Sequence, residues 1–133
     1  MTSVSLQSIV GCTLIPNVHY EKLTIFISLG QYAESISEIK RQIPHFVIRK
    51  LILEIECFSF FKYETNFPSN VFSLQYNPLG IVQDIIQIRL NTVGKLIIRF
   101  NDYLLRPPGI IHVNQFDVYL HPAEKYIKLI DRL

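Results

Sequence analysis

The amino-acid sequence predicts a mainly β fold on the border of the α+β class. The expected architecture is an antiparallel β-sandwich or curled sheet of about six to seven strands, with one internal helix and a C-terminal helix. Three observations carry this prediction. Short segments alternate apolar with polar residues, proline and glycine separate them at loop-like spacing, and 133 residues is the length of one domain. Residues 1–133 are therefore expected to form a single domain.

The strand predictions follow the two-residue period of a half-buried sheet. In segment 23–29, the side chains of Leu23, Ile25, Ile27 and Leu29 share one face. Further strands are expected at 4–15, 46–61, 71–76, 81–90, 95–101 and 110–120.

The short connections favour antiparallel neighbours. Hairpins are expected between 4–15 and 23–29 and between 81–90 and 95–101. In 110–120 the apolar positions shift by one residue around Asn114–Gln115, which predicts a β-bulge.

Two segments change to the period of a helix. In 31–43, Tyr32, Ile36, Ile39 and Ile43 are spaced by four, three and four residues, and Pro44 ends the segment. The tail 122–133 begins with Pro122, a residue suited to the first turn of a helix. Its apolar stripe comprises Tyr126, Leu129, Ile130 and Leu133.

Composition narrows the class of function. Charged residues make up 18% of the chain, below the roughly 25% of a typical soluble domain, and the mean hydropathy is +0.25. This balance favours an apolar surface hidden in an assembly. A net charge of +2 is too mild for a nucleic-acid surface. Because the sequence has neither a signal peptide at Met1–Ser5 nor an apolar run of membrane length, a cytoplasmic location without membrane contact is expected.

Motifs that would carry catalysis are absent from the sequence. It has no glycine-rich phosphate loop and no nucleophile elbow, and its four histidines do not stand at metal-ligand spacing. Cys12 and Cys57 lie in apolar runs and are interpreted as small core hydrophobes, with a disulfide between them left open. No catalytic residue, no metal site and no cofactor is predicted.

One pair of carboxylates supports an alternative. Glu54 and Glu56 are two residues apart and share a face of the predicted strand, and Asp84 could add a third carboxylate. A small metal-dependent hydrolase or nuclease would need these three groups to converge. The sequence alone does not determine whether they do.

The aromatic surplus provides the leading functional hypothesis. Six aromatic residues crowd one segment, more than one face of a sheet can bury: Phe58, Phe60, Phe61, Tyr63, Phe67 and Phe72. Aromatic side chains are enriched at protein interfaces, so a non-enzymatic protein-binding module or a homo-oligomer subunit, such as that of a homodimer, is expected.

No family motif is matched residue by residue. In outline the chain resembles the small β-rich bacterial proteins that include immunity proteins, which neutralise a toxin. This resemblance implies a protein partner. A small-ligand-binding β-domain with a cavity between sheet and helix is the third hypothesis.

Overall fold

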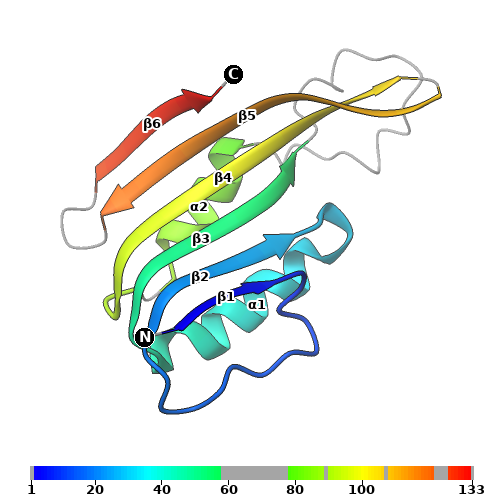
Figure 1. Ribbon diagram of the computed structural model, residues 1–133. Helices are drawn as coiled ribbons and strands as arrows, with labels where there is room; N and C mark the ends of the chain where they lie inside the picture. Colours follow the sequence, from blue (N-terminus) through cyan, green and yellow to red (C-terminus); the bar gives the residue numbers. More distant parts are fainter. Residues whose placement is uncertain (1, 58–77, 89, 107, 122–125, 133) are drawn as a thin grey trace.

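A mixed β-sheet with helices on one face forms the fold in the computed structural model, which describes residues 2–57, 78–88, 90–106, 108–121 and 126–132. The fold is a strand-rich α+β arrangement, as the sequence predicts at this coarse level (Figure 1). The elements in chain order are β1 (Thr2–Leu6), β2 (Tyr20–Ile27), η1 (Leu29–Gln31), α1 (Tyr32–Gln42), η2 (Ile43–His45), β3 (Ile48–Cys57), α2 (Pro78–Ile86), β4 (Val93–Arg106), β5 (Gly109–His121) and β6 (Tyr126–Arg132).

The strands follow one another across the sheet in chain order, from β1 to β6. β1 to β4 are mutually parallel, whereas β5 and β6 are antiparallel to their neighbours. The predicted antiparallel sandwich is therefore wrong in two respects: the described strands form one sheet, and its first four strands are parallel. The reason is that crossovers, not hairpins, join the first four strands. Among the described residues, no helix has the length and apolarity needed to cross a membrane.

The internal helix is confirmed. α1 spans Tyr32–Gln42 and buries Tyr32, Ile36 and Ile39, which belong to the predicted apolar stripe. Glu34 lies in its first turn and two basic residues lie in its last turn, as the helix dipole favours.

The strand predicted at 81–90 is a helix instead. α2 spans Pro78–Ile86 and buries Ile81, Val82 and Ile85, whose i, i+1, i+4 spacing forms one helical stripe. Its Ile86 side chain is exposed. Alternation and helical periodicity both fit this short apolar run, and packing against the sheet selects the helix. The predicted hairpin between 81–90 and 95–101 is accordingly wrong.

The C-terminal helix predicted at 122–133 is also wrong, because β6 occupies Tyr126–Arg132. β6 pairs antiparallel with β5, from Gln115 opposite Arg132 to His121 opposite Tyr126. The free edge of β5 offers a row of backbone donors and acceptors, and pairing satisfies them. Pairing with β5 therefore outweighs the local helical pattern of the segment, whose residues also suit a strand.

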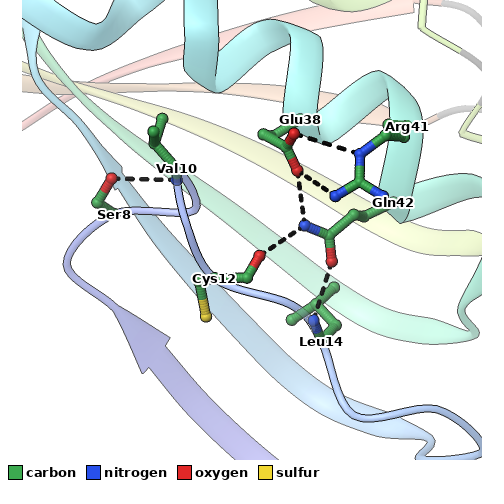
Figure 2. A network of polar contacts seen from close by, with 7 residues as sticks. All are labelled: Ser8, Val10, Cys12, Leu14, Glu38, Arg41 and Gln42. Atoms are coloured by element: carbon green, nitrogen blue, oxygen red, sulfur yellow. Dashed lines mark hydrogen bonds and ion pairs between the residues drawn. The ribbon is translucent and has the colours of Figure 1, made fainter.

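The segment before β2 forms neither a long strand nor a hairpin. β1 ends at Leu6, and the hydroxyl of Ser8 then accepts a hydrogen bond from the backbone N–H of Val10 at 3.1 Å, which turns the chain. Beyond the turn, Gln42 of α1 holds the segment (Figure 2). The side-chain carbonyl of Gln42 accepts from the Leu14 N–H at 2.9 Å, and its amide donates to the Cys12 carbonyl at 2.7 Å. This anchoring makes the connection a crossover, so β1 lies parallel to β2.

The core lies between the sheet and the two helices, which occupy the same side of the sheet in Figure 1. As predicted for β2, Leu23, Ile25 and Ile27 point into it. The corresponding buried positions of the two neighbouring strands are Leu51, Leu53 and Ile55 in β3 and Leu96, Ile98 and Phe100 in β4.

The predicted bulge in β5 is confirmed, although it falls at Val113 and not at the junction proposed from the sequence. Asp102 of β4 pairs with Asn114, whereas the next residue, Tyr103, pairs with His112. Val113 is therefore the extra residue, and the shift in apolar parity along the strand marks it. The predicted strand at 71–76 lies outside the described residues.

Candidate functional site

The face of the sheet opposite α1 and α2, which we call the outer face, is the candidate site. Parallel sheets normally carry helices on both faces, but both described helices pack on the same one. The outer face carries alternate residues of four adjacent strands. These residues are Lys22, Thr24 and Phe26 of β2, Lys50, Ile52, Glu54 and Glu56 of β3, Lys95, Ile97, Arg99 and Asn101 of β4, and Gln115, Asp117 and Tyr119 of β5.

The strand register arranges these residues in rows across the sheet. At the amino ends of the parallel strands, Lys22 pairs with Lys50 and Lys50 with Lys95; we call these three the lysine row. The next row contains Ile52 and Ile97, which are buried although they point away from the helices. The stems of long charged side chains on either side of an isoleucine can shield it in this way.

A depression of about 570 Å³ contains the lysine row. Its lining also includes Ser3, Glu21 and Arg49. Among the described residues of the lining, Glu21 is the one carboxylate, and it pairs with Arg49, with 3.3 Å between Oε1 and Nη1. The pair is largely exposed and contributes little to stability. The depression therefore holds a surplus of positive charge that its own carboxylate does not balance.

The lysine row places like charges on adjacent strands. Neighbouring strands lie about 4.8 Å apart, and like charges directly opposite one another destabilise a sheet. Lys22 and Lys50 form no ion pair with any carboxylate in the described part of the chain. The Nζ atom of Lys95 lies 5.0 Å from the ring centroid of Tyr119, a cation–π contact that leaves its charge in place.

Gly94 sets the floor of the depression, and it is required by a close approach of two backbones. A Cβ atom at this position would lie 2.8 Å from the carbonyl oxygen of Arg49. We expect Gly94→Ala to lower the free energy of unfolding by about 1–3 kcal/mol, because β3 and β4 must move apart. Chemical denaturation measures this change. Gly30→Ala is the matched control, since a Cβ there meets nothing within 4 Å. Equal stabilities of the two variants would contradict the close approach.

Further along the outer face, Arg99 and Asp117 form a buried ion pair. Nε of Arg99 donates to Oδ1 of Asp117 at 2.9 Å, and Nη2 donates to Oδ2 at 3.1 Å. Asp117 is 0% exposed, and Glu54 lies 3.9 Å from Nη1 of the same guanidinium. The hydrogen bonds with Asp117 raise the pKa of Arg99, and the charges of both carboxylates act in the same direction. Arg99 therefore stays charged, and its hydrogen bonds to Asp117 tie β4 to β5.

At the carboxyl ends of the strands, polar side chains are engaged with the fold. Glu56 accepts a hydrogen bond from the Leu29 N–H at 3.3 Å, and Gln115 donates to Asn101 at 2.6 Å. Burial raises the pKa of Tyr103, and the nearby charges of Glu56 and Glu54 raise it further. This phenol therefore stays protonated at neutral pH. The end of the outer face distant from the lysine row is thus acidic and internally bonded.

The three carboxylates proposed for a hydrolase do not converge. Glu54 and Glu56 lie on the outer face, whereas Asp84 belongs to α2, on the other side of the sheet. There Asp84 accepts a hydrogen bond from the Tyr32 hydroxyl at 2.7 Å, which links the two helices. Within the described ranges, no three His, Cys, Asp or Glu side chains are placed to hold a metal ion.

Two cysteines and an aromatic segment also stand out in the sequence. Cys12 is a free cysteine. The side chain of Cys57 lies outside the described part of the structure. The aromatic segment predicted to bind a protein also lies outside it; this segment comprises Phe58, Phe60, Phe61, Tyr63, Phe67 and Phe72.

Sequence reasoning missed the lysine row, although a signal for it exists. Three strands have lysine followed by leucine as their third and fourth residues: Lys22–Leu23, Lys50–Leu51 and Lys95–Leu96. In each case the leucine is buried in the core and the lysine points to the outer face. The three pairs are unevenly spaced along the chain, so they become a row only when the parallel register is known.

Comparisons with known proteins identify no relative. No protein-family model, no curated protein and no solved structure matches this chain. The protein is therefore classified by its structure alone. It has a strand-rich α+β fold whose parallel strands present a basic depression on the outer face of the sheet.

Proposed function

We propose that this protein is a non-enzymatic cytoplasmic binding protein that holds a protein partner on the outer face of its sheet. The observation that carries the proposal is the lysine row, a line of positive charge that the depression does not neutralise. Like charges placed side by side cost stability, and an acidic partner removes that cost.

The arrangement of the parallel strands supports this choice of face. β2, β3 and β4 follow one another in one direction, carry the same Lys–Leu pair as their third and fourth residues, and have both described intervening helices on one side. Repeated strand–crossover units of this kind build an extended sheet surface, which solenoid proteins use to bind partners. The outer face is the corresponding surface here.

The positive charge favours a protein partner over a nucleic acid. The three lysines form a short row across three strands within one depression, and the net charge of the chain is only +2. The cation–π contact of the row in the described part of the chain is a single one, between Lys95 and the ring of Tyr119. Bases that stack need a series of such rings.

Two classes of protein partner are proposed, a toxin that this chain neutralises or a second copy of the chain. The immunity role rests on size and on the absence of catalytic motifs, and a toxin gene beside the coding sequence would support it. Self-association rests on the low charge of the chain, and light scattering would show a mass of two subunits. The aromatic segment 58–72 stays a prediction as an additional anchor in either case.

Photo-cross-linking tests which face binds. A photoreactive amino acid replaces Ser3, at the rim of the depression, or Lys40, which is exposed on α1. In native host cells we expect a discrete adduct from the Ser3 position and none from the Lys40 position. Mass spectrometry then identifies the partner, including a second copy of this chain. Adducts from Lys40 alone, or from neither position, would overturn the proposal.

A further inference from the structure

We infer that the lysine row receives an acidic α-helix of the partner protein, which lies across β2, β3 and β4 with one line of carboxylates facing the lysines. This inference rests on the proposed function and adds the chemistry and the conformation of the bound segment.

The chemistry follows from the donors that the depression presents. The three lysine ammonium groups and the Ser3 hydroxyl all donate hydrogen bonds, and Glu21 is already paired with Arg49. A partner that fits must therefore supply acceptors with negative charge. Carboxylates of Asp or Glu meet this need in a protein partner.

The conformation follows from spacing. Successive lysines of the row stand on adjacent strands, about 4.8 Å apart. Carboxylates three or four residues apart on a helix have Cβ atoms about 5–6 Å apart, whereas alternate side chains of an extended strand are roughly 6.7 Å apart. The helix matches the row more closely. Three acidic residues at i, i+4 and i+7 would meet Lys22, Lys50 and Lys95 in turn.

A compact phosphate group fits the row less well. The lysines occupy matching positions on three adjacent strands, and the planar Arg49 guanidinium, which suits phosphate, is paired with Glu21. A helix also has its own backbone hydrogen bonds, so it needs only its side chains to bind a sheet surface.

The test uses the full chain and a designed helical peptide of about 20 residues, long enough to be helical in water. The peptide carries glutamates at i, i+4 and i+7, and the control peptide has the same composition with its glutamates spread around the helix. We expect two-dimensional amide NMR to show shifts at Lys22, Lys50 and Lys95. The control peptide should bind at least about fivefold more weakly, because each lost ion pair costs a few tenths to 1 kcal/mol.

Variants then assign the contact. Lys22→Gln, Lys50→Gln and Lys95→Gln should each weaken the binding of the first peptide about two- to fivefold, as expected for exposed ion pairs. Lys40→Gln on α1 should leave it unchanged. Added salt should weaken binding to the native protein more than to the triple variant.

The outcomes separate this inference from the proposed function. Equal shifts with both peptides, or binding unaffected by the lysine variants, would overturn the acidic helix. Tighter binding of inorganic pyrophosphate or of a single-stranded oligonucleotide at the same residues would overturn it as well. If the Ser3 cross-link to the partner persists in the triple lysine variant, the outer face still binds a partner and only the acidic helix is refuted.

Discussion

Replacing Arg99 with methionine is expected to lower the free energy of unfolding by about 3–5 kcal/mol, the largest effect among the substitutions considered for this protein. The guanidinium makes two hydrogen bonds to Asp117, at 2.9 and 3.1 Å, and Asp117 is 0% exposed. Methionine fills a similar volume but leaves this carboxylate buried without its main positive partner. A buried carboxylate that loses the guanidinium closest to it is costly, so the loss exceeds that of an exposed ion pair.

The double variant Arg99→Met with Asp117→Leu is the control. Replacing a buried ion pair by apolar residues of similar volume is often neutral, so the double variant should recover most of the lost stability. Urea denaturation of the native protein, the two single variants and the double variant gives the coupling free energy. Additive losses, with the double variant the least stable of the four, would contradict a dominant role for the ion pair.

Replacing Gln42 with alanine is expected to lower the free energy of unfolding by about 2–3 kcal/mol. Its side chain satisfies the buried N–H of Leu14 and the carbonyl of Cys12, and it also donates to Glu38 at 2.9 Å. Alanine leaves the two backbone groups without these partners. The segment before β2 then loses its attachment to α1 (Figure 2).

Two measurements separate this effect from a general loss of stability. The amide of Leu14 should exchange with solvent faster than the amides of β2. The pKa of Glu38 should rise toward its ordinary value, since hydrogen bonds from Arg41 and Gln42 lower it in the native protein. Gln31→Ala is the matched control, because the Gln31 side chain accepts an exposed bond from Ser8. Uniform acceleration of exchange throughout the sheet would argue against a local anchor.

The elements that could be predicted from the sequence are those whose side-chain period fits only one type of secondary structure. In β2 the alternation of Leu23, Ile25 and Ile27 with polar residues excludes a helix, and these side chains are buried as expected. In α1 the spacing of Tyr32, Ile36 and Ile39 excludes a strand. Both patterns are local, so the segment itself contains the information.

The predictions that were wrong concern segments in which two patterns of side chains compete. Segment 81–90 alternates as well as a strand does and also has a helical stripe, and packing against the sheet selects the helix α2. The tail has helical spacing but becomes β6, since the edge of β5 offers backbone partners that no local pattern records. Neither outcome can be read from the segment alone.

In the candidate site, too, some features follow from the local side-chain period and others do not. Glu54 and Glu56 share a face, as the two-residue period requires, but Asp84 lies across the sheet from them because its segment is a helix. The Lys–Leu pairs near the start of β2, β3 and β4 are visible in the chain, yet nothing in their spacing indicates that they align.

The amino-acid sequence by itself determined the strand-rich α+β class, the helix at 32–42 and the inward face of β2, because side-chain periodicity acts over a few residues. Only the tertiary structure decided the parallel order of the first four strands and the burial of the Arg99–Asp117 pair. It also decided the alignment of Lys22, Lys50 and Lys95 in one row. These features depend on which distant segments pair and in which register, and that choice follows from how the whole core packs and not from any single segment.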